Sequence, residues 1–354
     1  MPTSFNFFKL ILGMQIPTLT NEALVFHKSI ASQQDFLSHY NRYILPYVEN
    51  FEQQRIKALN KVRFRSHLLI PIIIATLTLF FKYLPWQTVN NPAGPLDDPI
   101  FLIISLIVSA IAIIFASYPL IQYQQTVQTT IYPNIFNFFG NFQYSTNSEF
   151  PMQDVAIFDI LPYYDNQFLT NSVCGTYKEV DLYFTQAQLT EQVQINNTDK
   201  TRTKTVLVFK GILLLFSINK PFAGKTIIKT EKNTFAKLLD VISTKMSRVK
   251  LEDPVFEKKF EVYATDQIEA RYLLSTSFME RLLKLAALFD NANLQCSFCE
   301  KQLFIMIPSL KPYFNNNSAF EPANFVADIN NIIDQMNIIF EIIETLKLNA
   351  TNKL

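Results

Sequence analysis

The chain has 354 residues, of which 49% are hydrophobic and 17% are charged, with 31 Lys and Arg against 30 Asp and Glu. This balance excludes a global electrostatic attraction to nucleic acid, and the low charged fraction indicates that part of the apolar surface meets lipid. Three cysteines are too few for a disulfide framework and favour a reducing compartment, while six glycines weaken any function that needs glycine-rich phosphate loops.

Residues 1–66 are predicted to form a cytosolic, mainly helical segment. Lys9 interrupts the first apolar run and no basic start precedes it, which favours a short amphipathic segment over a signal peptide. A helix is expected from Asn21 to Arg65, with a kink or break at Pro46.

The end of this segment is basic. Each cation there can contribute about 1 kcal/mol of attraction to an anionic lipid surface. Ordinary positive flanking of a membrane span explains the same pattern without specific lipid recognition. The candidate lipid-surface contacts are Arg55, Lys57, Lys61, Arg63 and Arg65.

Residues 67–121 are predicted to form a transmembrane hairpin with spans over about 67–84 and 100–120. Ile100 to Tyr118 is a run of nineteen uncharged residues, the length that crosses a hydrocarbon core of about 30 Å. The first span is shorter, but Lys82 can extend outward to the interface. The alternative is a buried core helix, and neither span contains a G-x-x-x-G packing motif.

The connecting loop, 85–99, has two Asp and no Lys or Arg, whereas basic residues precede the first span. The positive-inside rule therefore places the loop outside and both termini in the cytoplasm.

Residues 122–354 are predicted to form a connecting helix and a cytosolic α+β domain made of a mixed antiparallel sheet and helices. Thr203–Asn219 is rich in β-branched and aromatic residues, and we expect two strands that bend at Lys210-Gly211 after a polar hairpin loop. Asn324–Leu348 is expected to be a long final helix. The fold class is α+β, with an N-terminal helix and a two-helix transmembrane hairpin before this domain.

Cys296 and Cys299 form a C-x-x-C pair, a spacing found in redox dithiols and in half of a zinc site. The residues that follow alternate like a strand, and residues three apart on a strand face opposite sides, so the two sulfurs should diverge. A zinc site would need two more ligands, whereas Cys174 is the only other cysteine and no histidine follows His67. We expect no metal and no cofactor, and a redox role for the pair is left open.

The same lack of late histidines means that no Ser-His or Cys-His arrangement can be built within the domain by itself. The sequence AGKT, Ala223 to Thr226, resembles the end of a phosphate-binding loop. Its first glycine is replaced by Asn219, and a strand rather than a helix is expected after it. We therefore do not expect nucleotide binding there.

Acidic residues are frequent between Glu252 and Glu269. Such a group can carry acid–base chemistry or hold a divalent metal, but it more often forms a solvated, salt-bridged surface. Asp266, Glu269 and Arg271 are the candidates for a partner-binding or acid–base site.

Several blocks carry a family resemblance: FKGILLLFSINKPFAGKTII, LEDPVFEKKFEVYATDQIEARYLLSTSFMERLL, CSFCEKQLFIMIP and the closing FEPANF and LKLNATNKL. They resemble the bacterial membrane-protein family catalogued as domain of unknown function 3137. The resemblance runs from about Phe36 to the C-terminus. It implies a basic helix, a hairpin of two spans and a cytoplasmic mixed domain without an established activity. It also implies that the flanking cysteines are not required and that the AGKT block is not a phosphate loop.

The leading hypothesis is a non-enzymatic, multi-pass protein of the bacterial cytoplasmic membrane whose cytosolic domain binds a protein partner or the membrane surface. A second hypothesis is a membrane-associated enzyme that uses Asp266 and Glu269 with Arg271. A third is a secreted effector inserted in a host membrane. The expected partners are the lipid bilayer and an unidentified protein, with a homo-oligomer as a further option and no nucleic acid.

Overall fold

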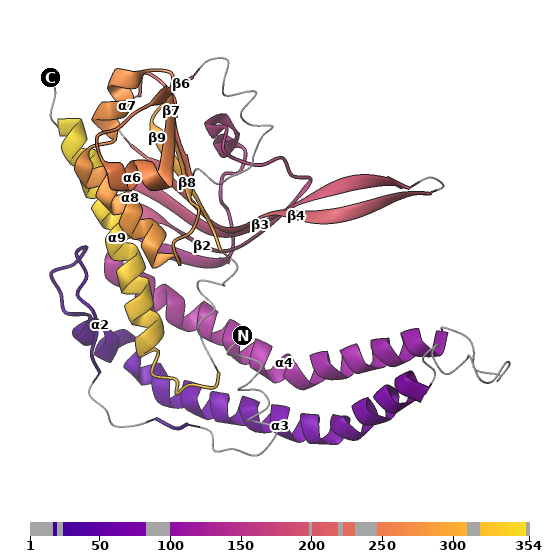
Figure 1. Ribbon diagram of the computed structural model, residues 1–354. Coiled ribbons are helices and arrows are strands. Elements are labelled where there is room, and N and C mark those ends of the chain that lie inside the picture. The colour runs from indigo at the N-terminus through magenta and orange to yellow at the C-terminus, as the bar shows by residue number, and fades with distance from the viewer. Residues whose placement is uncertain are drawn as a thin grey trace. The chain divides into compact units, whose positions relative to one another are not determined.

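Figure 1 shows the computed structural model of the chain. It describes residues 17–19, 24–82, 100–197, 200–218, 222–230, 246–309 and 319–351. The predicted outside loop, 85–99, lies outside the described residues. The chain forms two compact units. Unit 1 comprises Met1–Ala23, Tyr40–Thr130 and Asn317–Phe325, and unit 2 comprises Leu24–His39, Ile131–Asn316 and Val326–Leu354.

Two long helices, α3 (Leu45–Lys82) and α4 (Ile100–Phe136), form most of unit 1, and the last turns of α4 belong to unit 2. At 1.5 Å per residue, the 38 residues of α3 extend about 57 Å, enough for a basic surface segment followed by an apolar one. The helix predicted from Asn21 is wrong at its start, because residues 24–35 are not helical and α2 (Phe36–Tyr43) begins at Phe36. The break predicted at Pro46 is confirmed, because α2 ends just before it and α3 begins at Leu45. Pro46 then lies in the first turn of α3, where a missing N–H costs least.

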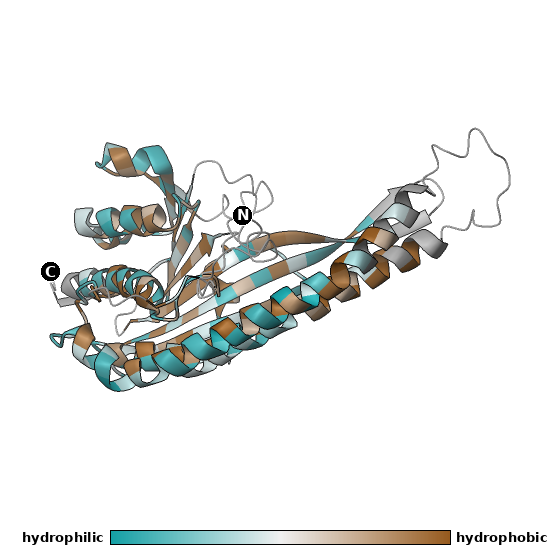
Figure 2. Cartoon of the chain, turned by 90° about the horizontal axis from the view of Figure 1, so that it is seen from below, coloured by the Kyte–Doolittle hydropathy of each residue, from teal (hydrophilic) through white to brown (hydrophobic). Residues whose placement is uncertain are grey.

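Within unit 1, α3 and α4 lie side by side (Figures 1 and 2). The rings of Phe51 and Tyr123 pack edge to face with centroids 6.3 Å apart, and the hydroxyls of Thr76 and Ser109 are 2.9 Å apart. Buried positions on α3 recur at spacings of three and four residues, the pattern of a helix packed along its length. They include Val48, Phe51, Arg55, Ala58, Val62 and Ser66.

Among the described residues, one helical stretch, Leu106–Phe139, is long and apolar enough to cross a membrane. Only 22% of its most apolar window is buried, whereas the core helix of a soluble protein would be mostly buried. The described residues of the other predicted span, in α3, give no second such stretch. The structure therefore supports one candidate span and does not confirm the two-span hairpin.

The described part of unit 2 contains a nine-stranded sheet in the order β1-β2-β3-β4-β9-β8-β5-β7-β6, in which every neighbouring pair is antiparallel. The predicted α+β class with an antiparallel sheet is confirmed. The strands are β1 (Gln143–Asn147), β2 (Asn166–Tyr177), β3 (Val180–Asn197), β4 (Lys200–Ser217), β5 (Thr226–Thr230), β6 (Ser247–Val249), β7 (Phe260–Ala264), β8 (Gln295–Cys299) and β9 (Gln302–Pro308).

The bend predicted at Lys210-Gly211 is wrong, because β4 runs straight through these residues as one strand. Gly211 pairs with Pro308 of β9, and a Cβ on Gly211 would lie 2.0 Å from the carbonyl oxygen of Ile307. The glycine is therefore required for the close approach of a neighbouring strand, not for a turn.

Of the polar residues 194–204, predicted to be a hairpin loop, 194–197 end β3 and 200–204 begin β4, at the far end of a long hairpin. β3 and β4 pair out to Asn197 and Lys200, whereas β2 leaves β3 at Thr190 and β9 leaves β4 at Gly211. Figure 1 shows this hairpin extending beyond the rest of the sheet. Alternating threonines explain the extension, because threonine favours strands and tolerates water.

The sheet is apolar on both faces. On one face, Leu213 and Leu215 of β4 belong to a buried cluster with Phe304 of β9. On the other, Phe298 of β8 packs against Phe278, with ring centroids 5.4 Å apart. The helices of unit 2 are α6 (Pro254–Lys259), α7 (Gln267–Leu273), α8 (Thr276–Leu288) and α9 (Val326–Thr351), and α9 is the predicted final helix. Short 3-10 turns lie at η2 (Asn137–Phe139) and η3 (Asp154–Phe158).

Candidate functional site

The apolar half of the α3–α4 pair exposes large hydrophobic side chains. Ile107, Ile111 and Ile114 are 52%, 60% and 62% exposed. Figure 2 shows hydrophilic residues prevailing toward one end of the two helices and hydrophobic residues toward the other. A contiguous apolar row of this size marks contact with lipid or a partner rather than with water. We define the apolar belt as Leu68 and Ile74 of α3 with Ile103, Ile104, Leu106, Ile107, Val108, Ile111, Ile113, Ile114 and Phe115 of α4.

Behind the apolar belt, the face that α4 turns inward is small and polar. Ala112 and Ala116 are buried four residues apart, and one turn earlier Ser109 lies within hydrogen-bond distance of Thr76 on α3. Small residues at this spacing let helix backbones approach closely, and hydroxyl hydrogen bonds join helices where water is absent. The absence of G-x-x-x-G in the sequence does not reveal this pair, because two alanines at the same spacing also let helices approach closely.

Arg55 lies inside unit 1 and not at a surface. Its side chain is fully buried and bonds both carboxylate oxygens of Glu52, at 2.8 and 2.5 Å. It also donates to the carbonyl oxygens of Ala319 and Pro17, and Glu52 accepts from the N–H of Ala323. The buried ion pair thus ties two distant segments to α3. The expectation that Arg55 contacts lipid is corrected, because its side chain is fully buried against Glu52 and the segments at Pro17 and Ala319.

Arg65 lies at the end of the apolar belt. Its guanidinium stacks over the ring of Phe115, 4.3 Å from the centroid, and Nη1 donates to the Phe115 carbonyl oxygen at 2.9 Å. In a regular helix that oxygen would accept from residue 119, but Pro119 has no N–H. Arg65 supplies the missing donor from the neighbouring helix. Arg63, by comparison, is half-buried.

Lys57 and Lys61 line a cavity of about 550 Å³ between α3 and α4, which we call the basic groove. Buried residues form its floor, and exposed polar side chains form its rim. The floor consists of Ala58, Pro119 and Tyr123, and the rim of Gln54, Lys57, Lys61, Gln122, Gln125, Thr126 and Thr129.

In unit 2, the structure brings Asp266 and Glu269 together at the start of α7. Asp266 is the N-cap, and its carboxylate accepts from the N–H groups of Ile268 and Glu269 at 2.8 and 3.0 Å. Glu269 accepts from the N–H groups of Ala223 and Gly224, both at 2.7 Å. Both carboxylates are therefore engaged by backbone amides in a structural arrangement.

The remaining predictions for this region follow from the same contacts. The strand predicted after AGKT is β5, and the two amides at Ala223 and Gly224 that could face a phosphate instead hold Glu269. A Cβ on Gly224 would lie 2.4 Å from Oγ1 of Thr265, so the loop packs tightly against the turn before α7. Arg271 is exposed on α7.

The two C-x-x-C cysteines lie on β8 as predicted, and both are free. Cys296 is fully buried, and burial raises the pKa of its thiol. Cys299 packs against the cluster that contains Phe304, on the other face of the strand, and burial raises the pKa of its thiol as well. Thiols of raised pKa hold little thiolate at neutral pH and are poor nucleophiles.

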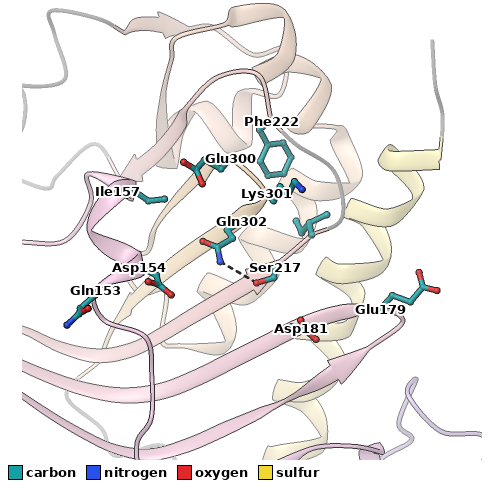
Figure 3. A pocket seen from close by; sticks show the side chains of 11 residues that line it. Gln153, Asp154, Ile157, Glu179, Asp181, Ser217, Phe222, Glu300, Lys301 and Gln302 are labelled. Atoms are coloured by element: carbon teal, nitrogen blue, oxygen red, sulfur yellow. Dashed lines mark hydrogen bonds between the residues drawn. The ribbon is translucent and has the colours of Figure 1, made fainter.

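A pocket of about 950 Å³ in unit 2 lies where the β2–β3 and β8–β9 turns meet the end of β4 (Figure 3). Acidic residues prevail in its lining, but Glu179 lies across the pocket from Asp154 and Glu300. The described residues contain no group of three or more His, Cys, Asp or Glu that could hold a metal ion. Carboxylates that do not converge give no acid–base pair for a reaction.

Residues 207–348 match the family described as protein of unknown function (DUF3137). No curated protein matches the chain. The crystal structure of the mycobacterial trehalose monomycolate transport factor A matches with a TM-score of 0.27 and 10% identity, covering 56% of this chain and 88% of that chain. A likeness of this size carries no argument about fold or function.

The DUF3137 segment contains the Glu269 contacts and the C-x-x-C strand, whereas the apolar belt and the basic groove precede it in the chain. The features that suggest a membrane therefore come from this chain's own geometry and not from the family match.

Proposed function

We propose that this chain is a membrane-anchored, non-enzymatic interaction module. In the proposal, α3 and α4 cross the bacterial cytoplasmic membrane as a hairpin, and both termini and unit 2 lie on the cytoplasmic side. The observation that carries the proposal is the apolar belt, a continuous exposed hydrophobic surface on a helix pair whose internal contacts are small and hydroxyl-bearing.

The proposed span in α3 is supported by its contacts with the span in α4. Thr76 lies in the apolar half of α3 and is within hydrogen-bond distance of Ser109 of α4, so the two apolar halves lie at the same depth. Leu68 and Ile74 are also exposed there, at 62% and 55%. Lipid that surrounds one helix of such a pair surrounds the other.

Membrane fractionation of the full chain tests the anchor. Ile107→Lys with Ile111→Lys places two cations in the apolar belt, each expected to cost about 2.5 to 3.5 kcal/mol at the bilayer centre. The wild-type chain should stay in the membrane after an alkaline wash, and the double variant should be released or degraded.

Ile121→Lys is the matched control. It changes an isoleucine of the same helix that is 42% exposed but lies beyond Tyr118 and the apolar belt. This variant should remain in the membrane. A wild-type chain recovered from the aqueous fraction, or a belt variant retained as well as the control, would contradict the anchor.

An interaction role rather than an enzymatic one is supported by Asp266 and Glu269, because both carboxylates accept hydrogen bonds from backbone amides of the fold. In-cell crosslinking of the tagged full chain followed by mass spectrometry should recover a protein partner in stoichiometric amount. Turnover of a nucleotide, lipid or peptide by the purified protein, lost on a single substitution that preserves the fold, would instead establish an enzyme.

A further inference from the structure

We propose that the basic groove binds the phosphate of an anionic phospholipid headgroup, and this inference rests on the proposed membrane hairpin. The groove lies next to the apolar belt on both helices. On α4, three residues separate the belt residue Phe115 from the first groove residue, Pro119. On α3, Lys61 precedes Leu68 by seven residues, or about 10 Å along the axis. This is the depth at which lipid phosphates meet a membrane protein.

The charge of the groove favours an anion. Lys57 and Lys61 are four residues apart on one helix face, where like charges repel by about 0.2 to 0.5 kcal/mol. Neither lysine has an ion-pair partner in the part of the chain that the structure describes. None of the described residues that line the groove is acidic. A bound phosphate would relieve the repulsion and satisfy both cations.

The neutral rim supplies one further donor, because its threonine hydroxyls are already engaged. The hydroxyls of Thr126 and Thr129 donate back to the carbonyl oxygens of Gln122 and Gln125, at 2.9 and 3.0 Å. The side-chain amide of Gln125 makes no hydrogen bond among the described residues, so it can donate to a ligand. Two ammonium groups and one amide donor suit the several acceptor oxygens of a phosphate.

The shape of the groove fits an entering headgroup. Ala58 and Pro119 have short side chains and face each other's helices, which leaves a depression where larger residues would close the seam. Pro119 therefore shapes the groove and also frees the Phe115 carbonyl oxygen that Arg65 caps. Because the belt begins beyond the groove on both helices, acyl chains attached to a bound phosphate would extend along that belt.

The test uses the full chain in nanodiscs of phosphatidylcholine with a minor share of phosphatidylglycerol, and native mass spectrometry counts the phosphatidylglycerol that stays bound after release into detergent. Lys57→Gln with Lys61→Gln should reduce its retention about thirty-fold, which is the ~2 kcal/mol of two lysines at 1.4 kcal/mol per factor of ten. The matched control is Lys250→Gln with Lys258→Gln, which removes two exposed cations from unit 2 and should retain the lipid.

The outcomes separate the two proposals. A chain that does not enter the disc contradicts both the hairpin and the lipid site. A groove variant that enters the disc and holds phosphatidylglycerol as the wild type does overturns the lipid site alone, as does an equal loss in the control. Displacement of the lipid by excess inorganic phosphate from the wild type would identify free phosphate as the ligand and also overturn the lipid assignment.

Discussion

The two units distribute polar and apolar residues in opposite ways. Unit 2 buries aromatic side chains such as Phe216 and Phe298 within its sheet and helices, as domains in water do. Unit 1 buries the ion pair of Glu52 and Arg55 and exposes the isoleucines of the apolar belt. The difference shows that the surrounding solvent decides which side chains are buried. Under the proposed function, the solvent around the apolar belt is lipid.

The most direct way to break this contrast is to remove the charge that unit 1 buries. Arg55→Ala leaves the Glu52 carboxylate buried without its partner, and we expect a loss of about 3 to 5 kcal/mol of unfolding free energy. Denaturant unfolding of the full chain in detergent measures it. Arg63→Ala, at a half-buried position of the same helix, should cost less than about 1 kcal/mol. Equal losses of unfolding free energy in the two variants would show that the Glu52–Arg55 ion pair contributes no more to stability than the Arg63 side chain does.

The corresponding test in unit 2 is Glu269→Gln. The amide can accept only one of the two backbone N–H groups that the carboxylate accepts, so the segment around Ala223 and Gly224 should open at a cost of about 1 to 3 kcal/mol. Hydrogen exchange should rise at these two amides while the sheet stays protected. Glu280→Gln, at an exposed position on α8, is the control. Unchanged exchange together with a lost cellular function would favour a catalytic role for Glu269.

A smaller effect tests how α3 and α4 are joined. Arg65→Met removes the donor to the Phe115 carbonyl oxygen and should destabilise the full chain, whereas Pro119→Ala restores a donor within α4. In the Pro119→Ala background, Arg65→Met should therefore cost about 1 kcal/mol less than in the wild type. A double-mutant cycle by unfolding in detergent gives the coupling. Strict additivity would mean that the two residues act independently.

The smallest expected effect is a pH dependence in unit 2. Burial lowers the pKa of His39, whose Nε2 donates to the carbonyl oxygen of Asn134 at 2.7 Å. The folded chain favours the neutral ring, so stability is full above pH 6.5 and falls as the pH drops through the lowered folded pKa. His39→Gln keeps a donor for the same oxygen and should flatten this slope. An unchanged slope in that variant would assign it to other groups.

Sequence patterns predicted those parts of the molecule that depend on local periodicity. The final helix, the break at Pro46 and the strand that carries Cys296 follow from apolar spacing and proline geometry, and the structure agrees. The α+β class follows from the same patterns. The bend predicted at Gly211 is wrong because the strand that requires a glycine there lies almost a hundred residues away in the chain. Only the close approach of that strand explains why a residue without a Cβ occupies this position.

The site was harder to predict because its contacts are distant in the chain. Arg55 belongs to a basic run by sequence, yet its partners include Ala319, which no local pattern connects to it. Glu269 looked like a surface acid because the loop that it holds, at Ala223, is more than forty residues earlier. The basic groove needs both helices, so Lys57 and Lys61 could be predicted but their common cavity could not.

The central claim is that lipid surrounds the apolar belt. Its most direct test places single cysteines, labelled with an environment-sensitive fluorophore, at Ile74, Ile111 and Ile121 of the full chain reconstituted in vesicles. We expect quenching by lipid-borne nitroxides at Ile74 and Ile111 and by aqueous iodide at Ile121. Quenching by iodide at Ile74 and Ile111 without quenching by the lipid probe would contradict the membrane hairpin.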